Sequence, residues 1–365
     1  MQGTAVRVHT PGRVPRNERS GREPGIAARN EPRAVKMRLG LALPQYDYSV
    51  AGESPLPWTR VVEWARAAEA AGFDSLWLSD HLFLDVAKYG GPPDREGCLD
   101  PIVAFAALAG EVTRVRLGTL VLCEALRPAA VLAKALAGVD IVCGGRLDVG
   151  IGAGWYEPEY AAIGMDMPRP GERLDRLREA ITILRGLLGG GPCTFDGRFH
   201  RADGALNEPA SVQAPSPPII VGGKGDRLLS LVADLANGWN TCWAWTPSAY
   251  QERLDVLDRA CDAVGRDPAS ITRSLGLYTL CGEDERDLAR RFERLQAMSP
   301  PGVLDGVTLD QWREGRLVGT VDEVREQADR WSALGVETLI VGLGAVPFAV
   351  TALDDLELVA QALRG

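Results

Sequence analysis

The chain has 365 residues, of which 46% are hydrophobic and 24% are charged, and its formal net charge is −9. This composition is sufficient to bury a full hydrophobic core, and no run of about 18 apolar residues is present that would span a membrane. The excess of acidic residues argues against nucleic acid as a partner, because surfaces that bind nucleic acid are normally basic. We therefore expect a soluble globular protein that binds neither nucleic acid nor membrane.

The numbers and positions of cysteine and histidine indicate the cellular compartment and whether a metal site is present. Seven cysteines are scattered along the chain without a C-x-x-C pair. Their odd number and spacing favour reduced thiols in the cytoplasm over a disulfide framework or a zinc site. Histidine is scarce and occurs at His9, His81 and His200. Because a histidine-rich metal site would lack ligands, we expect no bound metal.

Residues 1–36 differ in composition from the remainder. They carry eight Lys/Arg against three Asp/Glu, contain many Pro and Gly, and show no apolar periodicity. Such a segment predicts a disordered N-terminal extension. It lacks the apolar stretch of a secretory signal, and Met37, at the start of a strand-like run, is a candidate translation start. We expect one folded domain over residues 37–365.

From Met37 onward, short apolar runs alternate with longer amphipathic segments, which is typical of a parallel sheet with crossover helices. Eight runs have the composition of buried strands, and eight strands close an α/β barrel of the (β/α)8, or TIM-barrel, class. The predicted strands span Met37–Leu43, Ser75–Asp80, Val115–Leu122, Leu147–Ile151, Pro218–Gly222, Gly238–Cys242, Arg273–Cys281 and Thr338–Leu343.

The segments between these strands have helical periodicity. Asp100 is a candidate N-cap followed by proline in the first turn, and Gly72 and Gly335 are candidate C-terminal stops. The predicted helices span Thr59–Ala71, Pro101–Glu111, Ala129–Val142, Glu172–Leu188, Asp226–Leu235, Ser248–Val264, Glu283–Gln296 and Val321–Leu334.

Two stretches do not fit the repeat of strands and helices. Residues 189–217 are rich in Gly and Pro and contain an apolar/polar alternation around Asp196 and Gly197, which predicts a small antiparallel hairpin within an insertion. Residues 299–318 are less regular, and we expect a mobile loop over the site there.

The active site of such a barrel lies at the C-terminal ends of the strands, so the residues that leave each strand carry the functional information. Asp80 and His81 leave the second predicted strand. An imidazole at that place can exchange a proton with a reacting carbonyl or enolate, and Asp80 can hold a cofactor ring or the tautomer of His81. A purely structural histidine is the alternative, and the sequence leaves both open.

Glycines mark two further strand exits. The fourth predicted strand leaves through Gly150-Ile-Gly-Ala-Gly154-Trp155, followed by Glu157 and Glu159, which is not the G-x-G-x-x-G dinucleotide pattern. Glycine lets a flat ring approach the backbone, although a tight exit in a packed barrel explains the pattern equally well. The fifth strand leaves through Gly222-Gly223-Lys224-Gly225 into a helix, which offers amides and an ammonium to a phosphate; a turn without a ligand is the alternative.

Tryptophans divide into core and pocket candidates. We expect Trp64 and Trp77 in the core, and Trp155 together with the cluster Trp239, Trp243 and Trp245 as walls of a pocket.

Taken in order, these segments resemble the luciferase-like monooxygenase superfamily, and within it the branch that uses the deazaflavin coenzyme F420. The matching segments are residues 37–44 (MRLGLALP), 71–81 (AGFDSLWLSDH), 115–119 (VRLGT), 145–155 (GRLDVGIGAGW), and 218–223 (PIIVGG) with 236–240 (ANGWN). Each segment is modest alone, but together they keep their order over nearly the whole barrel.

The resemblance implies a barrel with an insertion region, a cofactor ring at the exits of strands two to four, and a phosphate held by Gly222, Gly223, Lys224 and Gly225. By position it places Asp80 and His81 against the ring and assigns a non-prolyl cis peptide to Leu120-Val121. It further implies that the cofactor is lined by Leu120, Val121, Cys123, Ala153, Gly154 and Trp155.

The function that follows from the resemblance is hydride transfer between F420 and a small organic substrate, an alcohol or ketone, an imine or an activated alkene, with His81 and Asp80 as catalytic residues. In deazaflavin-dependent sugar-phosphate dehydrogenases of the superfamily a catalytic Glu follows the third glycine. Here Trp155 occupies that position, which argues against glucose-phosphate oxidation.

Two alternatives stay open. One is an FMN-dependent monooxygenase in which reduced flavin activates O2, and the other is a barrel that binds a flavin without turnover. The resemblance also implies a homodimer.

Overall fold

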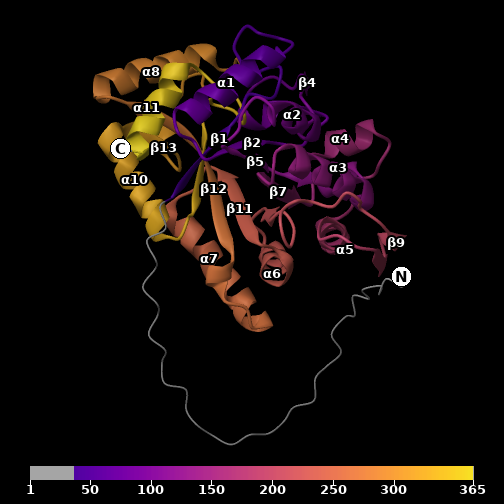
Figure 1. Cartoon of the computed structure of the whole chain (residues 1–365). Helices are drawn as coiled ribbons and strands as arrows, with labels where there is room; N and C mark the ends of the chain where they lie inside the picture. Colours follow the sequence, from indigo (N-terminus) through magenta and orange to yellow (C-terminus); the bar gives the residue numbers. More distant parts are fainter. Residues whose placement is uncertain (1–36, 365) are drawn as a thin grey trace, which may run out of the picture.

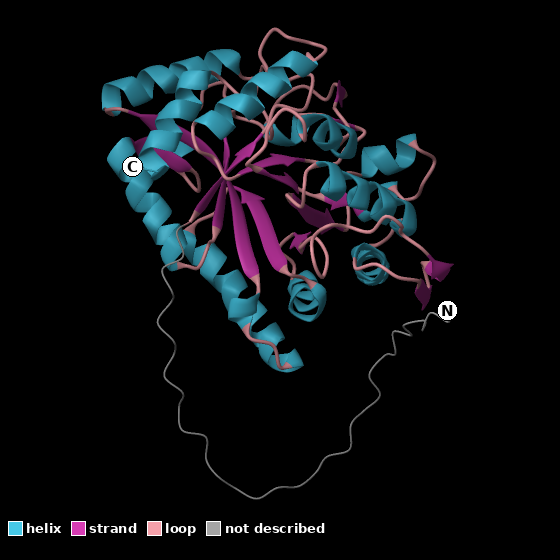
Figure 2. Ribbon diagram, viewed as in Figure 1, coloured by secondary structure: helices cyan, strands magenta, loops and turns pink. Residues whose placement is uncertain are grey.

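The computed structural model describes residues 37–364, so the extension predicted for residues 1–36 lies outside the described residues. Within them, eight parallel strands form a closed barrel surrounded by helices (Figure 1 and Figure 2). The barrel strands are β1 (Arg38–Ala42), β2 (Ser75–Leu78), β5 (Arg116–Thr119), β7 (Leu147–Gly152), β10 (Ile219–Gly222), β11 (Gly238–Trp243), β12 (Thr272–Gly282) and β14 (Thr338–Gly342).

The barrel strands follow one another in chain order around the ring, which closes where Ile219 of β10 lies opposite Val149 of β7. The predicted (β/α)8 fold and its strands are therefore confirmed, with bounds that shift by a few residues. Every residue of β2, β7 and β14 is buried. Such continuous burial is expected of parallel strands, because helices cover one face and the barrel interior covers the other.

Trp77 of β2 fills the barrel interior, where two glycines make room for it. A Cβ atom on Gly40 of β1 would lie 2.6 Å from Trp77 Nε1, and one on Gly118 of β5 would lie 2.5 Å from its ring. Trp77 and Trp64 are 2% and 4% exposed, so the prediction that both belong to the core is confirmed.

The helices of the described range surround the strands as predicted for most of the chain (Figure 1). Asp100 caps the second helix, since its side chain accepts the backbone N–H groups of Ile102 and Val103. The helices are α1 (Trp58–Ala70), α2 (Pro101–Leu108), α3 (Ala129–Val142), α4 (Glu157–Ala162), α5 (Pro170–Leu188), α6 (Asp226–Leu235), α7 (Pro247–Val264), α8 (Glu285–Met298), α9 (Leu309–Arg313), α10 (Val321–Ala333) and α11 (Leu353–Arg364).

The segment between β12 and α10 is more structured than expected. Residues 299–318, predicted as a loop, contain α9 and the beginning of β13 (Leu317–Thr320). β13 pairs in parallel with the far end of β12, through Leu317 opposite Thr279. The physical reason is the length of β12: it has 11 residues and extends past its barrel neighbours, where its backbone groups need another hydrogen-bonding partner.

Besides α9, two further helices were not predicted. α4 follows β7 after a few residues and carries Pro158 in its first turn. α11 follows β14 and packs against α1, α10 and β12, so it supplies the last helix of the barrel ring. Since α8 and α10 both lie between β12 and β14, α8 is an addition to the ring, although it was predicted as one of the eight barrel helices.

The hairpin predicted around Asp196 and Gly197 is present. β8 (Cys193–Asp196) pairs antiparallel with β9 (Arg201–Ala205), and Gly197 N–H donates to the His200 carbonyl at 3.0 Å. The carboxylate of Glu179 in α5 accepts the N–H groups of Arg198, Phe199 and His200, with distances from 2.8 to 2.9 Å. The hairpin is therefore fixed to the barrel helix that precedes it.

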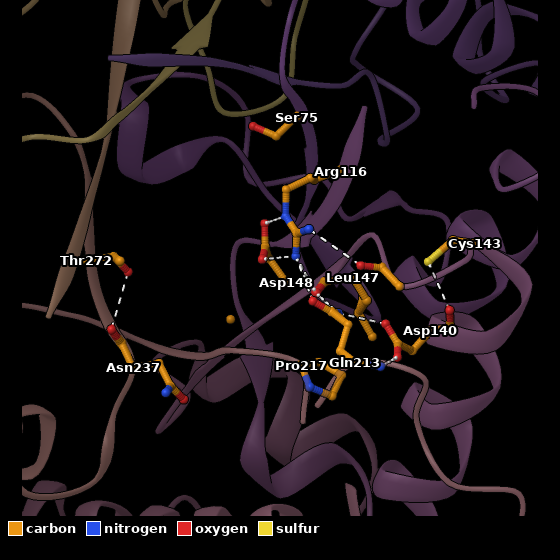
Figure 3. A network of polar contacts seen from close by, with 12 residues as sticks. Ser75, Arg116, Asp140, Cys143, Leu147, Asp148, Gln213, Pro217, Asn237 and Thr272 are labelled. Atoms are coloured by element: carbon orange, nitrogen blue, oxygen red, sulfur yellow. Dashed lines mark hydrogen bonds and ion pairs between the residues drawn. The ribbon is translucent and has the colours of Figure 1, made fainter. Parts of the chain in front are cut away.

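A polar network closes the barrel at the N-terminal ends of its strands (Figure 3). Arg116 of β5 donates to both carboxylate oxygens of Asp148 in β7, at 2.9 and 2.7 Å, and to Gln213 Oε1 at 3.2 Å. Gln213 in turn donates its side-chain amide to the buried Asp140 of α3 at 2.7 Å. This network ties the insertion of residues 189–217 to the barrel.

The opposite end is roofed by two segments that meet at glycines. Residues 82–97 contain β3 (Phe83–Leu84), the 3-10 helix η1 (Ala87–Tyr89) and β4 (Glu96–Gly97). A Cβ atom on Gly302 would lie 2.4 Å from the Gly90 carbonyl oxygen, so the two backbones touch. Val86 from this segment shares a separate apolar cluster with Val303, Leu304 and Trp312 from the segment between α8 and β13. In residues 37–364 no helix combines the length and the apolarity that crossing a bilayer would require.

Candidate active site

A cavity of about 360 Å³ opens at the C-terminal ends of the barrel strands. Most of the predicted site residues come together on its walls, although they lie at four different strand exits. The predicted site residues that line it are Asp80, His81, Leu120, Val121, Cys123, Gly154, Trp155, Gly222, Gly223 and Lys224. Two others, Ala153 and Gly225, lie next to lining residues in the chain but do not line the cavity.

His81 is held by a carboxylate that the sequence analysis noted without assigning a role. His81 Nδ1 lies 2.8 Å from Glu159 Oε2, and the side chains of His81 and Glu159 are 12% and 4% exposed. The other oxygen of Glu159 accepts the Leu82 N–H. Because the carboxylate occupies Nδ1, the remaining ring nitrogen, Nε2, is the one left for exchange of a proton.

Asp80 has a different partner from the one suggested by its position beside His81. Its Oδ2 accepts from the Arg127 guanidinium at 2.7 Å and from the Cys123 N–H at 2.9 Å. Burial raises the pKa of the Asp80 carboxyl, and the neighbouring guanidinium of Arg127 opposes that rise. The tautomer of His81 is thus set by Glu159, while Asp80 fixes the strand exit that carries Cys123.

The glycine pattern of β7 makes room for protein atoms. A Cβ atom on Gly150 would lie 1.9 Å from the Thr119 carbonyl oxygen, and one on Gly152 would lie 2.9 Å from Val121 Cγ2. Gly222 of β10 approaches the same Val121 side chain. The Leu120-Val121 peptide is cis, as the resemblance implied. Of the two interpretations offered for these glycines, tight packing around residues 119–121 explains Gly150 and Gly152.

Aromatic side chains form the remaining walls. Trp155 stands edge-on to the His81 ring, with centroids 5.6 Å apart, and is 46% exposed at the mouth. Trp243 and Phe348 also line the cavity and contact each other edge to face at 5.4 Å. Of the tryptophan cluster expected to wall a pocket, Trp239 is instead fully buried, and Trp245 lines a neighbouring hollow beside Lys224.

The end of the cavity near α6 is built mainly from backbone. Gly223 has φ +140°, a conformation that only glycine adopts readily. Its N–H donates to the Asn240 carbonyl at 3.0 Å, so an anion at this turn would use the amides that follow it. Gly225 is the N-cap of α6, and no side chain caps this helix. The N-terminal amides of α6 and the ammonium of Lys224 therefore form the group that suits a phosphate.

Several site residues escaped the sequence analysis. Three of them line the cavity: Tyr46 from the loop after β1, Lys88 from the roof segment and Phe348 from the loop after β14. Burial raises the pKa of Tyr46 well above its usual value, so its hydroxyl stays neutral and hydrogen-bonds Ser79 Oγ at 2.5 Å. Glu159 could have been favoured over Glu157 only by knowing that α4 begins there, because helix geometry turns one acid inward and the other to solvent.

Comparison with known proteins agrees with this geometry. The sequence pattern of luciferase-like monooxygenases matches residues 37–338. An F420-dependent hydroxymycolic acid dehydrogenase of Mycobacterium tuberculosis is 32% identical over 305 residues, which cover 81% of this chain and 80% of that protein. Pyrimidine monooxygenase RutA of Pantoea ananatis is 29% identical over 262 residues, which cover 68% of either chain.

Among solved structures, an F420-dependent secondary alcohol dehydrogenase in complex with an F420-acetone adduct aligns with a TM-score of 0.71, at 21% identity, over 90% of this chain and 100% of that one. At this identity the likeness shows the fold. Barrel, pocket and relatives together define an oxidoreductase. The chain belongs to the luciferase-like monooxygenase family.

Proposed function

We propose that this protein is an F420-dependent oxidoreductase that exchanges a hydride between the deazaflavin and a small organic substrate. The observation that carries the proposal is His81, held at the cavity wall by the buried carboxylate of Glu159 at 2.8 Å. A relative with 32% identity over 81% of this chain is named as an F420-dependent dehydrogenase, which supports the same cofactor here.

The residues present fit such a cofactor. The N-terminus of α6 has no side-chain cap and presents its amides beside Lys224, which suits the phosphate of the tail. The ring would lie between Asp80, His81 and the segment from Leu120 to Cys123 on one side and Gly154 with Trp155 on the other. These residues line one cavity, and their walls are largely apolar and aromatic. When bound, the deazaflavin supplies the carbon that gives or takes the hydride.

His81 accepts or donates the proton of the reaction. For an alcohol substrate, Nε2 accepts the hydroxyl proton as the C–H bond gives up its hydride; in the reverse direction the same nitrogen returns the proton to the carbonyl oxygen. The carboxylate of Glu159 on Nδ1 fixes the ring orientation and stabilises the imidazolium that forms. The rings of Tyr46 and Trp155 lie beside the His81 ring, at centroid distances of 6.3 and 5.6 Å, and limit its rotation.

The substrate class is an alcohol or ketone, an imine or an activated alkene. Trp155 stands where sugar-phosphate dehydrogenases of this superfamily carry a catalytic Glu, so the cavity lacks that second acid. The two carboxylates that line the cavity, those of Asp80 and Glu159, are already engaged by Arg127 and His81. We therefore assign all proton transfer to His81.

The second candidate is an FMN-dependent monooxygenase, which the RutA relative favours. Two assays separate the candidates, because a reduced deazaflavin reacts poorly with O2. Under air, the protein should oxidise a panel of alcohols with oxidised F420, followed by loss of the F420 absorbance, without consuming O2. O2 uptake with reduced FMN and a substrate, together with no F420 turnover, would assign the monooxygenase activity instead.

We further propose a cytoplasmic homodimer. Free thiols support the compartment: none of the seven cysteines, all within residues 37–364, forms a disulfide. For the dimer, α2 and α3 pack side by side and expose Val103 and Val131, at 69% and 61%, on their outer faces. Light scattering on the purified chain tests this, and a monomer at micromolar concentration would contradict it.

A further inference from the structure

Lysine is rare in this chain, and its distribution is uneven. It occurs at Lys36, Lys88, Lys134 and Lys224, and arginine or histidine supplies the cation of the ion pairs found within residues 37–364. Two of the three described lysines, Lys88 and Lys224, line the same cavity. The proposed function uses Lys224 for the cofactor phosphate and gives Lys88 no role.

Lys88 lies in η1, in the roof over the cavity, and it is exposed. Its ammonium stands 4.3 Å from the centroid of the Trp155 ring and 5.9 Å from that of Tyr89. In the described part of the chain no carboxylate forms an ion pair with it. An ammonium that contacts aromatic faces and has no carboxylate in an ion pair with it remains available to an anion.

The cavity contains no free negative charge that would neutralise Lys88. Asp80 is paired with Arg127 at 2.7 Å, and Glu159 accepts from His81 at 2.8 Å and from the Leu82 N–H. Both lysines act on the same thiol: burial raises the pKa of Cys242 to about 12, and the ammonium groups of Lys88 and Lys224 oppose this rise. The lining of this one cavity therefore carries two positive charges, that of Lys224, assigned to the cofactor tail, and that of Lys88, which has no assigned role.

Trp155 lies next to both Lys88 and His81, the residue proposed to exchange the proton. Its ring centroid lies 5.6 Å from that of His81, and the Lys88 ammonium lies 4.3 Å from the same indole. The Lys88 ammonium and the centroid of the His81 ring are therefore no farther apart than the sum of these two distances. This separation suits a molecule that carries its reacting carbon on one side of an aromatic ring and an anionic group on the other side. Trp243 and Phe348 offer flat apolar walls to such a ring.

We propose that Lys88 is the binding residue for a carboxylate on the substrate, and that the preferred substrates are aromatic alcohols or carbonyl compounds that carry this carboxylate away from the reacting carbon. The inference rests on the proposed function, because it concerns the substrate of that site. The carboxylate lies at the mouth beside the half-exposed Trp155, where desolvation is small. The reacting group then faces His81.

The test is a calorimetric titration of the full chain with benzoate and with benzamide, its neutral counterpart of the same shape, in the presence and absence of F420. We expect benzoate to bind roughly tenfold more tightly, in line with one charge-assisted hydrogen bond at a partly exposed site. This preference should weaken with added salt. Equal binding of the two compounds would overturn the proposal.

Substitutions of Lys88 distinguish the effect of its charge from the effect of its packing. Lys88→Gln should remove the preference for benzoate, whereas Lys88→Arg should keep it. Lys134→Gln, in which the removed ammonium donates to the Glu208 carbonyl far from the cavity lining, should leave it unchanged. A preference that survives Lys88→Gln would contradict the assignment.

The affinity for F420 is measured in parallel, because Lys88 could contact the cofactor instead. We expect the dissociation constant for F420 to be the same in Lys88→Gln as in the native chain, and a marked loss would overturn the substrate assignment. Failure of the proposed function is recognised separately: if neither F420 nor FMN binds, the titration without cofactor still reports whether the carboxylate subsite exists.

Discussion

The two ends of the barrel each contain a partly buried polar pair, and the two pairs differ in what surrounds them. At the N-terminal end, Arg116 and Asp148 join in two parallel hydrogen bonds, and Arg116 also donates to the Leu147 carbonyl at 3.0 Å. At the C-terminal end, His81 and Glu159 share one hydrogen bond, and Nε2 remains beside the cavity. Burial and pairing are similar at the two ends, and we propose a functional role only for the pair that lines the cavity.

This contrast predicts that changes at the C-terminal end reduce turnover with little effect on stability, and that changes at the N-terminal end do the reverse. The largest effect is expected for His81→Ala. Loss of the only proton-exchanging group proposed should lower kcat by about 10²–10⁴-fold. Steady-state oxidation of an alcohol with F420 measures it.

The control for His81→Ala is the cofactor affinity and the denaturation midpoint, which should both stay close to the native values. Activity that persists in this variant would show that His81 is a structural residue. An unchanged, zero activity in native and variant chains alike would identify a barrel that binds its cofactor without turnover.

The second-largest effect is a loss of stability, which we expect at the N-terminal end of the barrel. Arg116→Met leaves the carboxylate of Asp148, which is 10% exposed, without its partner. Breaking a buried pair costs about 3–5 kcal/mol, and the 28% exposure of Arg116 places this case near 3 kcal/mol. Urea denaturation measures the free energy of unfolding. Arg201→Met, which removes an exposed pair with Asp196, is the matched control and should cause no measurable change.

In the folded fraction of Arg116→Met, kcat should equal the native value, because the network lies at the end of the barrel remote from the cavity. A fall in kcat without a fall in stability would break the contrast between the two ends.

A smaller effect is expected for Glu159→Gln. The amide can still accept the Leu82 N–H, but it cannot stabilise a charged imidazole, so kcat should fall on the order of tenfold while KM changes little. Glu157→Gln provides the control, because Glu157 lies two residues earlier in α4 and is exposed. Equal effects of the two substitutions would refute the positioning role of Glu159.

The smallest effect is expected at the backbone-built end of the cavity. Lys224→Gln should weaken cofactor binding about fivefold, since the amides of α6 remain and only one partly exposed charge is lost. Fluorescence titration at low and high salt measures it, and the difference between native and variant chains should shrink as salt is added. A loss of more than about a hundredfold would mean that the ammonium, and not the helix terminus, holds the phosphate.

The sequence predicted the barrel because buried parallel strands such as β2, β7 and β14 have a strong apolar signal. It did not predict α11, which follows a loop of unusual conformation that includes Phe348 with φ +60°. The pairing of β13 with the end of β12 also escaped prediction, because a strand that lies outside the repeat is defined only by its tertiary partner.

For the site, the strand-exit rule placed Asp80, His81, Gly154 and Lys224 at one cavity. It could not assign partners. His81 and Glu159 are 78 residues apart in the chain, and the immediate neighbour of His81, Asp80, turns toward Arg127. Hydrogen-bond partners that are so far apart in the sequence depend on how the loops after β2 and β7 are arranged in the folded barrel. No local sequence pattern specifies that arrangement.

The most direct test of the central claim is a titration of the purified chain with F420 and, separately, with FMN, followed by quenching of tryptophan fluorescence. Trp155 and Trp243 line the cavity, so a ring bound there should quench strongly. We expect saturable quenching by F420 at micromolar concentration, with weaker or no binding of FMN. Absence of binding by both compounds would contradict it.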